Sequence, residues 1–297
     1  MDTAIEVHGL RKAFRGTTVV DGLSFTVARG EVFALLGPNG AGKTTTINIL
    51  TTLAAADAGS ATVAGRDVRT EATEVQRRIS LTGQSSAVDD ALTATENIVM
   101  FARLAGLGRA AARRRASDLI AQFELTDAAS RLVRTFSGGM RRRLDLALSF
   151  VVTPEVLFLD EPTTGLDTRS RRALWDIIRM LAKAGTTVFL TTQYLEEADQ
   201  LADRIAVLHD GRIAALGTPA VLKARIGGDT VELHDARGAL LREVPTDGTV
   251  ADLRRALDLL DEDGADGVVT LRRPTLDDVF FAVTAPADRT RTVKELA

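Results

Sequence analysis

The sequence predicts an α/β fold built around a parallel sheet, with a small α+β domain after it. A short apolar run at residues 32–36 leads through a glycine-rich turn into a segment with helical spacing, which indicates a strand, a loop and a helix. Two further apolar runs, at residues 156–159 and 187–190, flank an amphipathic segment and indicate a parallel crossover. The charge balance then changes sign near residue 228, which marks a second domain.

The size and composition are those of a folded protein. The chain has 297 residues, of which 45% are hydrophobic and 26% charged. At about 150 residues per domain, this length favours one large domain or two ordinary ones. The composition excludes a wholly disordered chain and a collagen-like repeat, and the absence of a period of about 20 to 50 residues excludes solenoids and propellers.

Several features predict a cytoplasmic chain without a signal peptide or a transmembrane segment. The most apolar neighbourhood, residues 144–159, contains Asp145, Pro154 and Glu155, and no stretch reaches the roughly 20 apolar residues of a spanning helix. The N-terminus has neither the basic nor the apolar region of a signal peptide, and the chain lacks cysteine. The net charge of −3 and the pI near 5.8 give no global reason to expect nucleic acid as a partner.

Charge and composition also divide the chain. Residues 1–228 carry a net charge of +3 and residues 229–297 a net charge of −6. We therefore expect a main domain at residues 1–227 and a small extension domain at residues 228–297. Within the main domain, residues from about 88 to 152 are rich in Ala, Leu and Arg and poor in strand formers, so they predict a helical subdomain that Pro154 closes.

The remaining elements follow in order along the chain. In the main domain we expect helices at 44–53 and 171–183 and a hairpin at 204–208 and 211–215. In the extension we expect strands at 230–234, 240–244 and 268–271 and helices at 250–260 and 277–283. Thr275, followed three residues later by Asp278, resembles a capping box for the last helix. The final dozen residues are expected to fray.

The glycine-rich turn carries the phosphate-binding pattern G-x-x-x-x-G-K-[ST]. Its glycines let successive backbone NH groups converge on phosphate oxygens at a helix N-terminus. Lys43 supplies a positive charge to the β- and γ-phosphates, and the Thr44 hydroxyl is a hard oxygen ligand for Mg²⁺. An ordinary glycine turn is the alternative, which the surrounding strand and helix disfavour. The predicted nucleotide contacts are Gly37, Pro38, Asn39, Gly40, Ala41, Gly42, Lys43, Thr44 and Thr45.

Asp160 and Glu161 end the apolar run at residues 156–159, at the carboxyl edge of the sheet, where ligands bind. We expect Asp160 to hold Mg²⁺ through water, and Glu161 to orient and polarise the water that attacks the γ-phosphate. Taken alone, an Asp-Glu pair at a strand end is usually a solvated turn. The phosphate-binding loop upstream favours the catalytic interpretation.

The run Phe136-Ser137-Gly138-Gly139-Met140 distinguishes between classes of phosphate-loop protein. It resembles the signature motif of ATP-binding-cassette (ABC) ATPases. The resemblance extends to Gln84 and to residues 92–97, 165–167 and 196–199, and it covers about residues 5 to 223. It implies a P-loop ABC-type nucleotide-binding domain, with a RecA-like parallel sheet core and a helical subdomain, that binds ATP and Mg²⁺ and hydrolyses ATP.

By the same resemblance, two cassettes meet head to tail as a homodimer. Residues 137–139 of one subunit would contact the γ-phosphate held by Lys43 and Thr44 of the other, which suits a helix N-terminus flanked by glycine. Asp167 would cross the dimer interface. One chain carries one set of motifs, so the second set comes from a second copy.

The resemblance also assigns roles to Gln84 and Phe14. Gln84 would touch Mg²⁺ and the attacking water and relay the state of the nucleotide to a partner. Phe14 stands where the family stacks an aromatic ring on adenine, and a core phenylalanine is the alternative.

Two positions depart from the common family pattern. Met140 replaces the usual Gln, and Gln193 stands where most members have a His that senses the γ-phosphate. The Gln193 amide can donate a hydrogen bond to the γ-phosphate, but it cannot become cationic or carry a proton. We therefore expect Glu161, Lys43 and Gln193 to support slow hydrolysis that does not titrate near neutral pH through Gln193.

The C-terminal segment at residues 273–280 is similar to the extension of the daunorubicin-resistance ATPase subunits, a drug-efflux branch of the family. This similarity implies the energising subunit of an exporter, which pairs with a separately encoded integral-membrane permease and lies peripherally on the cytoplasmic face of the membrane. A stabilising appendage is the alternative interpretation of the extension.

Other functions fit the sequence less well. A soluble ABC ATPase that works in translation or DNA maintenance would ordinarily show two cassettes or a long coiled-coil insertion. A GTPase would show an Asn-Lys-x-Asp motif, and a binding module without hydrolysis would not need Glu161. The arginine clusters at 113–115 and 141–143 are interpreted as helix faces. The three histidines lack metal-ligand spacing.

Overall fold

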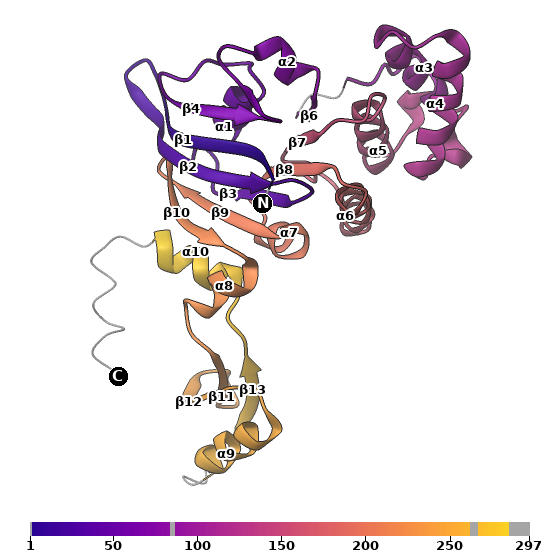
Figure 1. The fold of residues 1–297 in the computed structure, drawn as a ribbon. Coiled ribbons are helices and arrows are strands. Elements are labelled where there is room, and N and C mark those ends of the chain that lie inside the picture. Colours follow the sequence, from indigo (N-terminus) through magenta and orange to yellow (C-terminus); the bar gives the residue numbers. More distant parts are fainter. Residues whose placement is uncertain (1, 84–86, 262–266, 285–297) are drawn as a thin grey trace. The chain divides into compact units, whose positions relative to one another are not determined.

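The computed structural model describes residues 2–83, 87–261 and 267–284. The chain forms two compact units, Met1–Leu216 and Gly217–Ala297 (Figure 1). The boundary expected from the sequence, after residue 227, falls inside the second unit. Helix α8 (Pro219–Ala224) contacts helix α10 (Leu276–Thr284), so the residues just before position 227 pack with the C-terminal elements.

A six-stranded sheet forms the centre of the first unit. Its strands lie in the order β10-β9-β3-β8-β7-β6, and β9, β3, β8, β7 and β6 pair in parallel. Every residue of β3, β7 and β8 is buried, as expected for strands covered on both faces. The predicted parallel sheet is thereby confirmed. The strands are β3 (Val32–Leu36), β6 (Ile79–Thr82), β7 (Val156–Asp160), β8 (Thr187–Thr192), β9 (Arg204–His209) and β10 (Arg212–Gly217).

The predicted hairpin at residues 204–215 is also present. Strands β9 and β10 are joined by Asp210 and Gly211, which have φ angles of 46° and 74°. Two successive residues with positive φ form the tight turn that suits the twist of neighbouring strands.

A second sheet belongs to the first unit. Its strands are β1 (Thr3–Phe14), β2 (Thr17–Ala28), β4 (Ala58–Val63) and β5 (Arg66–Asp67), which pair in the order β2-β1-β4-β5 and are antiparallel. One apolar core joins this sheet, helix α1 (Lys43–Leu50) and the parallel sheet. Phe25 stacks on Phe33, and Phe33 on Phe189, with ring centroids 5.2 and 5.6 Å apart.

The helices of the first unit fall into two sets. Helices α6 (Thr168–Lys183) and α7 (Leu195–Leu201) pack against the parallel sheet, and α2 (Ala72–Gln76) contacts β5 and β6. Helices α3 (Ala94–Leu104), α4 (Arg109–Gln122) and α5 (Gly138–Ser149) contact one another within the span expected to be helical (Figure 1). Thr93 and Glu96 form a capping box at the start of α3, which fixes where this helix begins.

Helix α1 is shorter than the sequence pattern predicts. The predicted helix runs to residue 53, but α1 ends at Leu50 because Thr52 has a left-handed backbone, with φ 66°. The amide of Leu53 instead donates to the Asn48 carbonyl at 2.7 Å. The apolar spacing up to Leu53 therefore continues past the true end of the helix.

The second unit contains a three-stranded antiparallel sheet in the order β12-β11-β13. Its elements are β11 (Asp229–His234), β12 (Leu240–Thr246), α9 (Val250–Asp261), β13 (Val268–Arg272) and α10, as the sequence predicts. The capping box is confirmed, because the Asp278 amide donates to Thr275 Oγ1 and the Thr275 amide donates to the Asp278 carboxylate. The final dozen residues lie outside the described residues.

None of the helices in the described part of the chain combines the length and the apolar character that a bilayer crossing requires.

The aromatic cluster at the sheet yields a stability prediction. Phe189 is fully buried and its ring lies within 6 Å of three others, those of Phe25, Phe33 and Phe158. Phe189→Ala should therefore lower the free energy of unfolding of the first unit by about 3–5 kcal/mol. Urea unfolding followed by the fluorescence of Trp175, the single tryptophan of the chain, measures this change.

The matched control is Leu104→Ala. The Leu104 side chain is 77% exposed, so its loss should change the free energy of unfolding by no more than about 0.5 kcal/mol. Equal effects of the two substitutions would contradict the importance of the aromatic cluster.

Candidate functional site

The loop between β3 and α1 is held close to the strands beside it. Gly42 has φ 107°, and a Cβ there would lie 2.6 Å from the Val19 carbonyl oxygen. A Cβ on Gly37 would lie 2.4 Å from the Leu208 carbonyl oxygen. Only glycine fits at these two positions, because any Cβ would clash with the neighbouring backbone carbonyl. Helix α1 starts at Lys43, directly after the loop.

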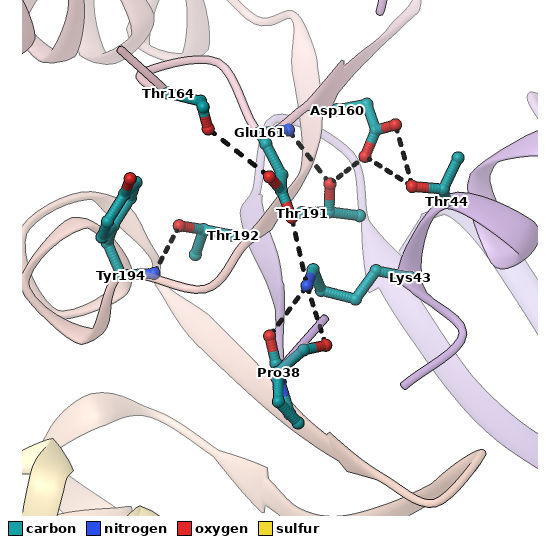
Figure 2. Close-up of polar contacts among 10 residues, drawn as sticks. Pro38, Lys43, Thr44, Asp160, Glu161, Thr164, Thr191, Thr192 and Tyr194 are labelled. Atoms are coloured by element: carbon teal, nitrogen blue, oxygen red, sulfur yellow. Dashed lines mark hydrogen bonds and ion pairs between the residues drawn. The ribbon is translucent and has the colours of Figure 1, made fainter. Parts of the chain in front are cut away.

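Lys43 lies at the centre of the site. Its side chain is 4% exposed, and Nζ donates to the carbonyls of Gly37 at 2.8 Å and Pro38 at 3.1 Å. The same nitrogen lies 3.1 Å from Glu161 Oε1 as an ion pair (Figure 2). An ammonium group has three donors, and these three acceptors hold its charge beside the loop.

Asp160 ends strand β7 and is 5% exposed. Its carboxylate accepts from Thr44 Oγ1 at 3.0 Å and from Thr191 Oγ1 at 2.6 Å (Figure 2). The pairing of β7 with β8 sets Asp160 directly beside Thr191. One buried carboxylate thus joins β7, β8 and α1.

The Thr44 hydroxyl and the Asp160 carboxylate form a donor set that suits Mg²⁺. Both are hard oxygen ligands, and they lie within hydrogen-bond distance of each other. Mg²⁺ usually keeps several waters and takes one or two protein oxygens together with substrate phosphates. Two protein oxygens next to a phosphate-binding loop fit this requirement.

Glu161 has a left-handed backbone, with φ 49°. Its amide donates both to the Thr191 carbonyl and to Thr191 Oγ1 at 3.1 Å. Its carboxylate contacts Lys43 and accepts from Thr164 Oγ1 at 3.4 Å. Non-glycine residues in this conformation are strained and cluster at functional sites. The two hydrogen bonds to Thr191 of strand β8 hold Glu161 in this unfavourable backbone conformation.

The signature run forms an exposed helix N-terminus. Ser137 caps α5 by accepting from the Met140 amide, and both Ser137 and Gly138 are exposed. A Cβ on Gly139 would lie 2.5 Å from Ser170 Oγ, so glycine permits the close approach of α5 to α6. A cavity of about 360 Å³ is lined by Gly138 and Glu161, among other residues.

Asp167 caps helix α6 on the exposed side of the site. Its carboxylate accepts from the Ser170 amide at 2.8 Å and from Ser170 Oγ at 3.1 Å. These hydrogen bonds lower the pKa of Asp167 below its ordinary value. The carboxylate therefore stays ionised at neutral pH.

The other predicted residues lie around this centre. Gln193 is half-buried and directly follows β8. Phe14 ends β1 and is 49% exposed, so it is not a core residue, and Lys12 Nζ lies 5.3 Å from the centre of its ring. Gln84 lies outside the described residues.

The structure adds Thr191, to which the sequence had assigned no role. It is fully buried, and its hydroxyl connects the Asp160 carboxylate with the Glu161 amide. The available signal was a pair of hydroxyl residues, Thr191 and Thr192, at the carboxyl end of an otherwise apolar strand. A buried hydroxyl at that edge requires a partner, and the partner here is the carboxylate of the neighbouring strand.

Known proteins resemble this chain in sequence and in fold. Residues 20–164 match the family model for the ABC transporter. The chain is 59% identical to the daunorubicin/doxorubicin resistance ATP-binding protein DrrA of Streptomyces peucetius, over 79% of this chain and 72% of that protein. It is 48% identical to the doxorubicin resistance ATP-binding protein DrrA of Mycobacterium tuberculosis, over 95% of this chain and 94% of that protein.

The chain belongs to the ABC transporter family of ATP-binding proteins. A solved ATP-binding subunit of an ABC transporter matches its fold with a TM-score of 0.66 at 29% identity, over 75% of this chain and 93% of that one. The resemblance inferred from the motifs, including the daunorubicin-resistance branch, is thereby confirmed. This ABC protein is a transport-associated ATPase.

A buried carboxylate lies beside the site of this ABC ATPase. Glu197 in α7 is 1% exposed and accepts from Trp175 Nε1 at 3.2 Å. Burial raises the pKa of Glu197 above its ordinary value, although hydrogen bonds and the charge of Arg142 oppose this shift. Folding therefore favours the protonated form of this group.

The raised pKa predicts a pH-dependent stability difference. The contribution of Glu197 to stability is greatest below the pKa of the unfolded chain and is lost as the pH rises through the higher folded-state pKa. Glu197→Gln keeps the side chain neutral at every pH. Its melting temperature relative to wild type should therefore increase between about pH 5 and about pH 8.

Thermal melts followed by Trp175 fluorescence measure this difference, with exposed Glu196→Gln as the matched control. A difference that stays constant with pH would contradict the prediction.

Proposed function

We propose that this ABC ATPase is the energising subunit of an exporter for a drug or another hydrophobic compound, and that it acts with a separately encoded integral-membrane permease. The observation that carries the proposal is the 48% identity to a doxorubicin resistance protein over 95% of the chain, which includes the second unit as well as the ATPase motifs. The relatives named above are drug-resistance proteins, which does not favour the alternative role in translation or DNA maintenance.

The geometry supports distinct roles for the site residues. Residues 37–45 bind the phosphates of ATP through backbone amides and the charge of Lys43. Thr44 and Asp160, together with Gln84, would hold Mg²⁺, which would neutralise developing phosphate charge. Glu161 orients the attacking water and accepts its proton, and its fixed backbone sets the direction of the carboxylate.

Two residues beyond this centre complete the proposed nucleotide contacts. Gln193 follows β8 and donates a hydrogen bond to the γ-phosphate. Phe14 stacks on the adenine ring, which its half-exposed side chain permits.

The exposed signature run supports a head-to-tail homodimer. Ser137, Gly138 and Gly139 of one subunit contact the γ-phosphate bound by the partner, since an exposed helix N-terminus attracts anions. Asp167 is ionised and exposed, and it crosses the interface between the subunits. The ATPase lies peripherally on the cytoplasmic face of the membrane, where the permease holds it.

The proposed role of Glu161 yields a prediction about assembly. Glu161→Gln should retain ATP binding but lose at least about 100-fold in the turnover number, because the general base is removed. The closed dimer should then persist in ATP and elute at twice the monomer mass in gel filtration. Lys43→Ala in the same background is the control, because it removes the charge that holds the phosphates. ATP binding without a dimer, tested with the permease present, would contradict the head-to-tail arrangement.

The transport assignment is tested by purifying the tagged chain from its native cells in mild detergent, with identification of the accompanying proteins by mass spectrometry. A polytopic membrane protein in about equal amount would support the exporter and identify the permease. Deletion of its gene should then increase drug sensitivity. Ribosomal or DNA-repair proteins in place of a membrane protein would overturn the transport assignment.

A further inference from the structure

Helix α5 carries a buried ion pair one turn beyond the signature run. Arg142 Nη1 lies 3.2 Å from Asp145 Oδ2, and the two side chains are 14% and 6% exposed. Arg142 Nε donates to the Pro162 carbonyl at 2.8 Å, and Nη1 donates to the Gly83 carbonyl at 2.9 Å. A single guanidinium group thus joins α5 to the loop after Glu161 and to the end of β6.

Asp145 extends this set of contacts. Its Oδ1 accepts from the Ala87 amide at 3.0 Å. Arg142 and Asp145 therefore bind the two residues that flank positions 84–86, Gly83 on one side and Ala87 on the other.

The end of β6 is bound to the same helix by further contacts. Ser80 Oγ donates to the Ser149 carbonyl at 2.6 Å, and the hydroxyls of Thr82 and Ser149 lie 2.6 Å apart. Strand β6 is therefore fixed to α5 along its length, and Gly83 follows directly after it.

A buried charge of this kind is costly to maintain. Burial lowers the pKa of Arg142, and the negative charges of Asp145, Glu197 and Asp160 oppose the shift. Replacement of a buried ion pair by apolar residues is often neutral or stabilising, so stability alone does not explain this pair. Because the guanidinium is a rigid planar fork, it fixes the directions of several acceptors at once, which a lysine cannot reproduce.

One acceptor belongs to the segment that carries the chemistry. Pro162 is bonded directly to Glu161, whose backbone is strained, and the other acceptor, Gly83, directly follows strand β6. Arg142 and Asp145 line the same cavity of about 360 Å³ as Gly138 and Glu161. Arg142 reaches Glu161 through the backbone of Pro162, which makes it a positioning group.

We propose that Arg142, held in place by Asp145, is a positioning residue for ATP hydrolysis that keeps Glu161 and the end of strand β6 in a fixed position relative to the signature helix. The inference rests on the proposed role of Glu161 and deepens it. In the proposed homodimer, the exposed N-terminus of α5 contacts the γ-phosphate of the nucleotide that the partner subunit binds. Arg142 consequently links the catalytic carboxylate of one site to the helix that contacts the other.

The test compares Arg142→Gln with Arg143→Gln in the full-length chain. Arg143 is the next residue of α5, but its guanidinium bonds Glu124, away from the catalytic segments. Loss of a residue that orients a directly acting group typically costs about 10–100-fold in activity. We therefore expect the turnover number of Arg142→Gln to fall by about that factor. The KM for ATP and the affinity for a fluorescent ATP analogue should stay within about threefold of wild type, since the phosphate loop is intact. Arg143→Gln should retain wild-type values.

Conservative variants separate positioning from damage to the fold. Arg142→Lys keeps the charge but loses the fork, so its turnover number should lie between those of wild type and Arg142→Gln. If Arg142→Gln unfolds at the assay temperature, as judged by Trp175 fluorescence, Arg142→Lys compared with Arg143→Lys decides the question. Asp145→Asn should lower the turnover number in the same direction, and its effect should not add to that of Arg142→Gln.

Three results would overturn the inference. The first is an unchanged turnover number in folded Arg142→Gln. The second is an increase in the KM of Arg142→Gln for ATP with its turnover number unchanged. The third is an equal loss of turnover number in Arg142→Gln and Arg143→Gln. Full turnover in Glu161→Gln would instead refute the proposed role of Glu161, and the inference with it. Failure to recover a permease would affect only the transport assignment, because hydrolysis is measured on the ATPase chain.

Discussion

The buried carboxylate of Asp160 is the interaction on which the geometry of the site depends. A carboxylate that is 5% exposed must have hydrogen-bond donors, and Thr44 and Thr191 supply them from different elements. Strand β7 is therefore held at fixed distances from helix α1 and from strand β8. The phosphate-binding loop precedes α1 and Glu161 follows β7, so this spacing also sets the loop relative to the catalytic carboxylate.

Backbone groups carry much of the organisation around this centre. The loop accepts the Lys43 ammonium through two carbonyls, Thr191 receives the Glu161 amide, and Arg142 binds the carbonyls that follow β6 and Glu161. Polar side chains thus fix peptide groups as well as one another. Such contacts restrict the position of a segment without occupying the space where a ligand binds.

The sequence predicted the parts of the site that are local in the chain. The phosphate loop, the Asp160-Glu161 pair and, in the second unit, the Thr275-Asp278 capping box depend on neighbours a few residues apart, so spacing reveals them. The roles of Thr191 and Arg142 depend on contacts over 31 and 59 residues, which no short pattern encodes. The pairing of β1 with the distant β4 in the four-stranded sheet was missed for the same reason. The packing of α8 on α10 likewise joins segments that are far apart in the chain.

The left-handed backbone of Glu161 has a consequence for how the sequence can vary. This conformation costs a non-glycine residue about 1–3 kcal/mol, so selection for stability alone would favour glycine at this position. Glycine would relieve the strain but remove the carboxylate. Position 161 therefore lies where stability and activity select different residues, and an ABC ATPase that no longer needed to hydrolyse ATP would be expected to lose its glutamate early in its divergence.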